Sequence, residues 1–252
     1  MKNLLFTFTL FLIVNFSFAQ TKIENDLSRD GLKGKVSFFS ESDYKLVEKF
    51  GEIEKGSGLL KNTYKFNVKG NMIEKNRYTF DGTLWEKTTY NYDVKGNKIE
   101  SNLYTTSGRL LFKFTYKYDV KGNRIESIVY NADGSLDGKH KTKYDEKGNE
   151  IEENSYNAGG SLYFKTTYKY DVKGNMIEKN RYNGDGSLDF NITYKYDEKG
   201  NMIEENYYIA GGSLSSKYTY NYEFDAMGNW IKKTSITVGK PNQLIERVIE
   251  YY

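Results

Sequence analysis

Hydrophobic and polar residues alternate along most of this chain with the period of a β-strand. The segment LYFKTTYKY at 162–170 places Leu, Phe, Thr and two Tyr at every second position, with Tyr, Lys, Thr and Lys between them. β-branched and aromatic residues dominate such segments, and both classes favour strands. A period of two predicts strands rather than helices.

The alternation is interrupted by turns at a fixed spacing. A Gly-Asn pair recurs five times with a period of 26 residues and then once after 28, and a second glycine keeps nearly the same period. Two turns in each unit predict two strands in each unit, and a fixed period of this length is typical of an array whose units lean on their neighbours. The first glycines are Gly70, Gly96, Gly122, Gly148, Gly174, Gly200 and Gly228; the second are Gly82, Gly108, Gly134, Gly160, Gly186, Gly212 and Gly239.

The residues of the first turn have structural reasons to recur. In Asp171-Val172-Lys173-Gly174-Asn175, Asp can accept hydrogen bonds from the turn backbone, and Gly can take the positive φ that closes a hairpin. A stacked row of such turns is also a weak candidate for cation binding, but each turn offers one carboxylate where a calcium loop presents several. We therefore expect capping by Asp and no metal site.

Positions that repeat indicate which side chains the architecture needs. Ile lies three residues after each glycine, and we predict that it is buried. Leu opens the first strand of six units, and Phe or Tyr closes it. These columns are Ile73, Ile99, Ile125, Ile151, Ile177, Ile203 and Ile231; Leu84, Leu110, Leu136, Leu162, Leu188 and Leu214; and Phe66, Tyr92, Tyr118, Tyr144, Tyr170, Tyr196 and Phe224.

One column conflicts with simple alternation. Ile177 and Tyr182 are five residues apart, so in an unbroken strand they point to opposite faces. Either a bulge resets the register, or aromatic residues line both faces of the sheet. We favour the second, because tyrosine hydroxyls can reach water.

The predicted fold class is all-β: a repeat array of antiparallel β-hairpins in 26-residue units. With ~14 to 16 strands at ~4.8 Å spacing, a flat sheet would be roughly 70 Å wide, and sheets of that width curl. We therefore expect a long, twisted, curled open meander or a partial shell. The terminal hairpin, with Pro241 in its turn and its last strand at 245–249, is expected to cap the sheet rather than pair with another molecule.

The N-terminus has the features of a signal peptide. Lys2 precedes an apolar run from Leu4 to Val14, and small residues at Ser17 and Ala19 predict cleavage after Ala19. The run is shorter than the ~20 apolar residues of a spanning helix. We assign residues 1–19 to the signal peptide, 20–35 to a linker, 36–55 to degenerate opening strands and 56–252 to the repeat domain. The protein is thus predicted to be exported, to the periplasm, the cell surface or the medium, with no membrane span after cleavage.

The unit Tyr-x-Tyr-Asp-x-x-Gly-Asn, present at 90–97, 116–123, 168–175 and 194–201, resembles the YD repeat of the Rhs family. The resemblance covers roughly residues 56–252 and implies a β-hairpin array, which spirals into a shell around a toxin domain in long relatives. This chain departs from the family pattern, because Asn rather than Arg-Leu follows the Gly and Asn67 replaces the Asp. It resembles small exported bacterial YD-repeat proteins, some of them labelled sugar-binding.

Composition excludes several function classes. The chain has 37 basic and 34 acidic residues, so nothing indicates a nucleic-acid partner. It has no Cys, no phosphate-binding glycine loop and no nucleophile elbow, and its one histidine, His140, belongs to no repeated constellation. We predict that the protein is not an enzyme and uses no cofactor.

Two functions remain. The first is a cell-envelope or extracellular binding module, with a polysaccharide as the candidate ligand; equivalent tyrosines would stand ~9.6 Å apart, comparable to a disaccharide step. The second is a scaffold that docks an envelope protein, such as an immunity or antitoxin-like partner, through an open edge or a concave face. A continuous exposed tyrosine row would favour glycan, and a buried row with a bare terminal strand would favour protein. The candidate ligand-binding residues are Tyr78, Tyr104, Tyr130, Tyr156, Tyr182 and Tyr208, with Trp85 and Trp230 as contacts specific to single units.

Overall fold

The structure is a computed structural model that describes residues 25–237 and 239–252, and in these residues it contains one helix and sixteen strands. The elements are α1 (Asp26–Arg29), β1 (Val36–Lys49), β2 (Glu52–Phe66), β3 (Met72–Thr79), β4 (Leu84–Tyr92), β5 (Lys98–Thr105), β6 (Leu110–Tyr118), β7 (Arg124–Asn131), β8 (Leu136–Tyr144), β9 (Glu150–Asn157), β10 (Leu162–Tyr170), β11 (Met176–Asn183), β12 (Leu188–Tyr196), β13 (Met202–Ile209), β14 (Leu214–Phe224), β15 (Trp230–Thr237) and β16 (Lys240–Tyr251).

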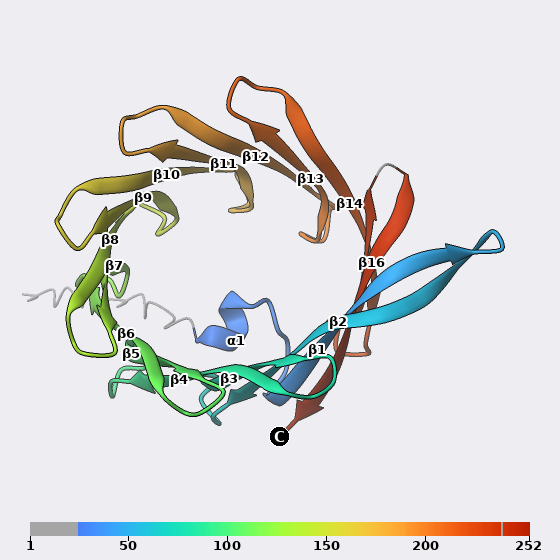
Figure 1. Cartoon of the computed structure of the whole chain (residues 1–252), viewed down its shortest axis with the longest axis horizontal. Coiled ribbons are helices and arrows are strands. Elements are labelled where there is room, and N and C mark those ends of the chain that lie inside the picture. Colours follow the sequence, from blue (N-terminus) through green and yellow to red (C-terminus); the bar gives the residue numbers. More distant parts are fainter. Residues whose placement is uncertain (1–24, 238) are drawn as a thin grey trace, which may run out of the picture.

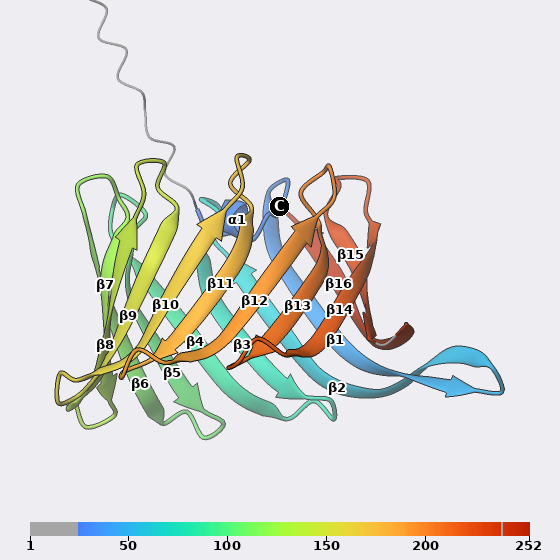
Figure 2. The ribbon, with the colours of Figure 1, turned by 90° about the horizontal axis from the view of Figure 1, so that it is seen from above.

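The sixteen strands form a closed barrel in which each strand pairs with its neighbours in the chain and β16 pairs with β1 (Figures 1 and 2). The all-β hairpin array is confirmed, but the open meander is wrong. Strand twist accumulates around the sheet, and sixteen strands are enough to bring its edges together. β1 then has a partner on each side, β2 and β16, with a β16 register that runs from Val36 opposite Tyr251 to Lys45 opposite Gln243.

Closure also changes the role of the terminal hairpin. β16 does not cap a free edge, because its antiparallel partner is the first strand of the same chain. Pro241 lies at the start of β16, beside a register shift in its pairing with β15, where a missing N–H does little harm. The expectation of a cap is therefore wrong.

The boundaries of the units follow the sequence columns. The six Leu residues open β4, β6, β8, β10, β12 and β14, and the Phe or Tyr column closes the strand before each Gly-Asn turn, as predicted. In the turn at 171–175, Gly174 has a φ of 89°, and the Asp171 carboxylate accepts hydrogen bonds of 2.9 Å from the backbone N–H groups of Lys173 and Asn175. The turn chemistry read from the sequence is confirmed.

A β-bulge lies at the start of the second strand of each unit. Tyr170 pairs with Met176 and Lys169 pairs with Glu178, so Ile177 is the extra residue. The bulge resets the register, and tyrosines also lie on both faces of the sheet, so both alternatives hold. The prediction that the Ile column is buried is wrong, since the six residues from Ile73 to Ile203 are 38–45% exposed. They lie at the bulge near the rim of a wall that is one sheet thick.

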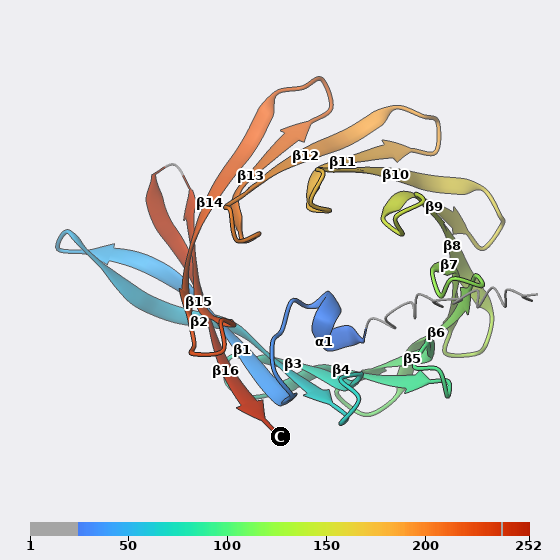
Figure 3. The ribbon, with the colours of Figure 1, turned by 180° about the vertical axis from the view of Figure 1, so that it is seen from behind.

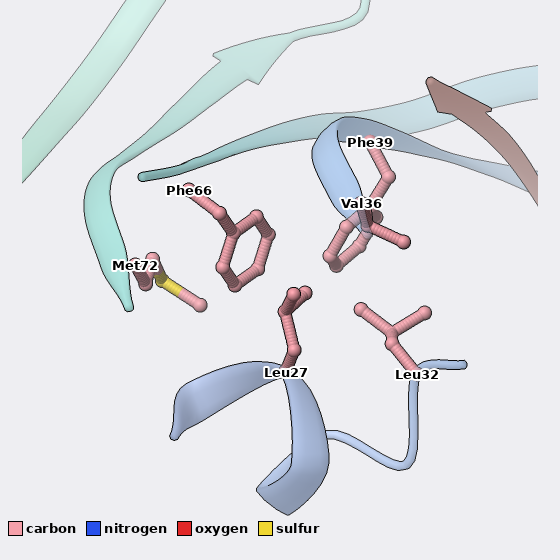
Figure 4. Close-up of a cluster of buried hydrophobic side chains, with 6 residues drawn as sticks. All are labelled: Leu27, Leu32, Val36, Phe39, Phe66 and Met72. Carbon is pink, nitrogen blue, oxygen red and sulfur yellow. The ribbon is translucent and has the colours of Figure 1, made fainter. Parts of the chain in front are cut away.

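Within the described residues, one cluster of buried apolar side chains lies at the seam of the barrel. Leu27 and Leu32, on and just after α1, pack against Val36, Phe39, Phe66 and Met72 (Figure 4). α1 lies inside the ring in both end views and close to one rim in the side view (Figures 1, 2 and 3). We call this end, where the Gly-Asn turns lie, the Gly-Asn rim.

The segment before β1 is fixed to the turns at this rim. The Leu27 N–H donates to the Gly70 carbonyl at 3.1 Å, and the Lys33 N–H donates to the side-chain oxygen of Asn229 at 2.7 Å. Residues 25–35 of the predicted linker are thus a structured part of the barrel. The predicted signal peptide, residues 1–19, lies outside the described residues. No helix in the described part of the chain is long and apolar enough to cross a membrane.

Candidate functional site: the barrel lumen

The pairing register divides the side chains of each strand between the lumen and the outer surface. Tyr64, Lys75 and Tyr90 line a cavity shared with α1, which lies inside the ring. Cross-strand partners share a face, so the inner face can be followed from pair to pair around the barrel. One column, five residues after each turn glycine, faces the lumen in every unit: Lys75, Ser101, Ser127, Glu153, Lys179, Glu205 and Lys233.

The outer face carries a ladder of ion pairs. Glu152 lies 2.8 Å from Lys143 and 3.0 Å from Lys165, and Glu204 is held in the same way by Lys195 and Lys217. Hydrogen bonds from these lysines lower the pKa of each glutamate to about 2. The outer column, four residues after the glycine, is Glu in six units: Glu74, Glu100, Glu126, Glu152, Glu178 and Glu204.

The predicted tyrosine series lies on this outer face, nearer the rim opposite the Gly-Asn turns. Tyr182 lies opposite Lys165 on one side and Leu188 on the other. All six tyrosines are half-buried, so they form neither the continuous exposed row nor the buried row that would decide between glycan and protein. An open groove of about 440 Å³ runs beside Tyr182, lined also by Leu162, Lys165 and Thr167. Ligand binding by this series remains a prediction.

The two tryptophans have different locations. Trp85 is 51% exposed at the rim opposite the Gly-Asn turns, with the Arg77 guanidinium 5.7 Å from its ring. Trp230 lies in the lumen, where the Arg247 guanidinium stacks 3.3 Å from its ring and Tyr222 meets it edge-on. Of the eight predicted site residues, Trp230 is the one that belongs to the lumen.

The Tyr-x-Tyr pair of the repeat supplies two inner columns with different tasks. The second tyrosine braces the wall: the Tyr118 hydroxyl donates 2.8 Å to the Lys98 carbonyl, and Tyr144 bonds Arg124 in the same way. The first faces polar lumen groups, as when Tyr116 meets the Ser101 hydroxyl at 2.6 Å. Burial raises the pKa of Tyr194 to about 12, which keeps its hydroxyl a hydrogen-bond donor at neutral pH.

A chamber of about 470 Å³ lies between α1 and the wall and combines charges of both signs with aromatic rings. Arg247 pairs with Glu41 at 2.8 Å, and the Tyr64 hydroxyl donates to the same carboxylate at 3.0 Å. Asp26 of α1 pairs with Lys98 at 3.4 Å and accepts from the Met72 N–H. Burial lowers the pKa of Lys98 and of Arg247, yet their carboxylate partners favour the charged forms.

His140 lies in the lumen but does not form a catalytic triad. Its Nδ1 lies 2.8 Å from the Ser155 hydroxyl and 3.8 Å from a Glu153 oxygen. A triad needs the hydroxyl and the acid on opposite ring nitrogens, whereas here both approach the same one. The absence of catalysis remains a prediction. Within the described residues no group of three or more His, Cys, Asp or Glu is placed to hold a metal.

The lumen column, five residues after each Gly-Asn glycine, is not among the positions where one residue recurs in every unit. The signal was available, because the column Lys, Ser, Ser, Glu, Lys, Glu, Lys changes in a repeat whose outer column is Glu in six units. The neighbouring inner column changes as well, through Thr88, Phe114, His140, Thr166, Ile192 and Tyr218. Only the pairing register reveals that the variable positions share the inner face.

Comparisons with known proteins give a fold and no activity. The family whose model matches is described as an uncharacterised protein, over residues 165–230. No curated protein matches the chain.

Solved structures match more widely. A porin-like protein from Bacteroides uniformis ATCC 8492 is 13% identical with a TM-score of 0.58, over 86% of this chain and 99% of that one. One from Bacteroides vulgatus ATCC 8482 is 15% identical with a TM-score of 0.42, over 86% and 98%. A chain of the Photorhabdus luminescens Tc holotoxin pore is 14% identical with a TM-score of 0.30, and only 12% of that chain is covered. The first likeness supports the barrel fold.

Proposed function

We propose that this protein is an exported, non-catalytic binding protein of the cell envelope, a small relative of the YD-repeat proteins, and that it binds carbohydrate in the barrel lumen. One observation carries the proposal: the inner columns of Lys75 and Thr88 differ from unit to unit, whereas the outer Glu column is the same in six units. Selection for folding alone would fix both faces equally, because each is half-buried in the same sheet. Inner columns that differ from unit to unit suit a binding surface, since neighbouring units then meet different parts of a ligand.

The outer surface supports an aqueous location. A lipid-facing charge costs about 2 to 4 kcal/mol at the middle of a bilayer, and the ladder puts lysines and glutamates on nearly every hairpin. A barrel that spans a membrane presents an apolar band in that place. The porin-like fold therefore serves here as a water-surrounded barrel, in the periplasm or at the cell surface.

The lumen has the chemistry of a carbohydrate site. A sixteen-stranded barrel encloses more space than its inner side chains fill. The inner tyrosines present flat rings together with hydroxyl donors, while lumen charges of both signs offer donors and acceptors side by side. Hydroxyl-rich ligands use both kinds of group, and sugar rings stack on aromatic faces.

The test is binding of residues 20–252 to an array of bacterial and host polysaccharides. One variant carries Glu153→Ser and Glu205→Ser, which installs the residue that Ser101 and Ser127 supply at this inner position in other units. A second, Tyr130→Ala/Tyr156→Ala/Tyr182→Ala, alters the outer series. Loss in the first variant alone supports the lumen, and loss in the second alone moves the site to the outer tyrosines. Absence of binding to any polysaccharide contradicts the carbohydrate assignment.

A second candidate, the scaffold or immunity-type partner, is favoured by one feature. The hairpin of β1 and β2 projects from the barrel (Figures 1 and 3), and Phe50 at its tip is fully exposed, with Ile53 also exposed at the start of β2. Closure removes the open terminal edge on which a docking partner was expected to pair. A partner protein would instead bind this tip. Phe50→Asn would then abolish binding of the partner protein without affecting glycan binding.

A further inference from the structure

The chamber beside α1 is a part of the lumen whose lining residues and volume indicate which class of ligand it can bind. α1 and the residue after it contribute Asp26, Arg29 and Asp30, and the wall contributes residues from six strands on both sides of the seam. Its volume of about 470 Å³ lies within the range of about 300 to 1,000 Å³ that small-molecule sites occupy. One or two sugar rings fit this space.

The charges of the chamber do not cancel. Four cationic side chains line it, Arg29, Lys75, Lys98 and Arg247, against three acidic ones, Asp26, Asp30 and Glu41, which leaves an excess of one positive charge. The internal ion pairs join Arg247 to Glu41, and Lys98 and Arg29 to Asp26. Lys75 and Asp30 remain, and neither forms an ion pair with another described residue.

Among the described residues that line the chamber, Lys75 is the cation without an ion pair. Its ammonium lies 5.4 Å from the Tyr64 ring, whose other neighbour is the stacked ring of Phe39 at 4.2 Å. Asp30 faces the solvent of the lumen, but the surrounding wall and then Asp26 raise its pKa, so its carboxyl holds its negative charge less firmly. The chamber thus offers a positive charge at Lys75 that forms no ion pair with another described residue.

We infer that this chamber binds a carboxylate-bearing sugar, such as a uronic acid at the end of an acidic glycan, with its carboxylate on Lys75; the inference rests on the proposed function. A small anion without hydroxyl groups would lie close to the three carboxylates of the chamber, and their repulsion would offset most of its attraction to Lys75. A uronic acid pairs its one carboxylate with Lys75, and its hydroxyls donate to acceptors such as Glu41 and Asp30. The ligand is therefore both anionic and rich in hydroxyl groups.

The repeat supplies a matched control. Lys179 occupies the same position of its own unit as Lys75, five residues after the turn glycine, and also faces the lumen. It does not line the chamber, and α1 does not reach it. Ser stands at this position in two other units, at Ser101 and Ser127, so a Lys→Ser change is compatible with the hairpin at either site.

The experiment is titration calorimetry of residues 20–252 with digalacturonic acid, with a neutral disaccharide and sodium acetate as comparison probes. We expect digalacturonic acid to bind and acetate not to bind. We expect Lys75→Ser to weaken the affinity for digalacturonic acid at least tenfold, and Lys179→Ser to leave this affinity within twofold of the wild type. Thermal unfolding of both variants, run in parallel, establishes that they are folded, and Lys75→Arg is expected to retain binding.

The outcomes separate the inference from the function on which it rests. Equal loss in both Lys→Ser variants, or none in either, overturns the assignment to Lys75. Binding of neutral but not acidic saccharides overturns the acidic ligand and leaves lumenal carbohydrate binding intact. Binding of acetate as tight as that of the sugar acid reduces the chamber to an anion site, and absence of binding to any saccharide contradicts the inference and the proposed function together.

Discussion

The phenolic hydroxyl of Tyr252 donates a hydrogen bond of 2.6 Å to the carbonyl of Phe66, 186 residues earlier in the chain. Tyr252 follows the last residue of β16, and Phe66 is the last residue of β2, so this bond reaches across β1 at the seam. Within the wall, tyrosines such as Tyr118 make a similar bond to a carbonyl 20 residues earlier. The seam therefore uses the same bracing device as the rest of the barrel.

Removing the Tyr252 hydroxyl should weaken the seam. We expect Tyr252→Phe to lower the free energy of unfolding by about 1 kcal/mol, the net value of a typical hydrogen bond whose acceptor is left unpaired. Urea denaturation followed by tyrosine fluorescence measures this loss. Tyr208→Phe is the control, because no hydrogen bond joins the Tyr208 hydroxyl to another described residue, and equal stability of the two variants would contradict a bracing role.

The sequence predicted each hairpin well and their assembly poorly. Leu162 and Tyr170 mark the ends of β10 because local alternation and turn chemistry act over a few residues. Closure depends on twist summed over sixteen strands, and no single unit encodes that sum. The bulge at Ile177 was one of two alternatives that the sequence left open, because a one-residue insertion changes the face of every following side chain without changing the composition.

The lumen was missed for a related reason. Recurring residues such as Tyr182 drew attention because they recur, but the Tyr182 series lies on the outer wall. Lys75 and Lys179 occupy a column that varies among Lys, Ser and Glu without an evident pattern, and only the pairing register shows that it lies inside the barrel. Trp230 was identified because it departs from its column, and it does lie in the lumen.

Asp26 holds α1 in the barrel through one carboxylate. It accepts from the Met72 N–H at 2.9 Å and pairs with Lys98. Asp26→Asn removes the charge from bonds worth about 1.5 to 3 kcal/mol each and leaves Lys98 unpaired, so we expect a loss of about 2 to 3 kcal/mol. Hydrogen exchange should show faster opening of the 67–71 turn, while Asp81→Asn, at the opposite rim, leaves that turn protected. Unchanged exchange in Asp26→Asn would mean that the apolar core alone retains α1.

The Glu–Lys ladder makes the free energy of unfolding decrease as the pH falls. The pKa values of Glu152 and Glu204 fall from an ordinary 4.5 to about 2 in the folded state. A depressed pKa contributes stability that is present above pH 4.5 and is lost as the pH falls toward 2. Urea midpoints at pH 7, 4.5, 3 and 2 should therefore drop mainly below pH 4.5. Glu152→Gln/Glu204→Gln should be less stable at pH 7 and show a flatter decline, and parallel curves would contradict the assignment.

The same ladder predicts no stable insertion into lipid. In flotation with vesicles of phosphatidylethanolamine and phosphatidylglycerol, residues 20–252 should remain in the aqueous fraction and should not raise bilayer conductance. The reason is the cost of placing Lys143, Glu152 and Lys165 in hydrocarbon. Single-channel conductance steps from the folded protein would overturn the aqueous location.

The tip of the β1–β2 hairpin carries strain that the fold does not need. Phe50 has a φ of 53° and Gly51 a φ of 86°, the left-handed pair of a two-residue hairpin turn in which Asn-Gly is the preferred sequence. The left-handed region costs an ordinary L-residue about 1 to 2 kcal/mol, and the Phe50 ring recovers none of this by packing because it is fully exposed. Phe50→Asn should therefore raise the free energy of unfolding by about 1 kcal/mol, whereas Phe50→Ala, which keeps an ordinary Cβ in the same conformation, should change it little. If the free energy of unfolding rises equally in both variants, removal of the exposed ring rather than relief of backbone strain is responsible.

If Phe50→Asn is more stable and also no longer binds a partner protein that the wild type binds, the strain is retained for docking.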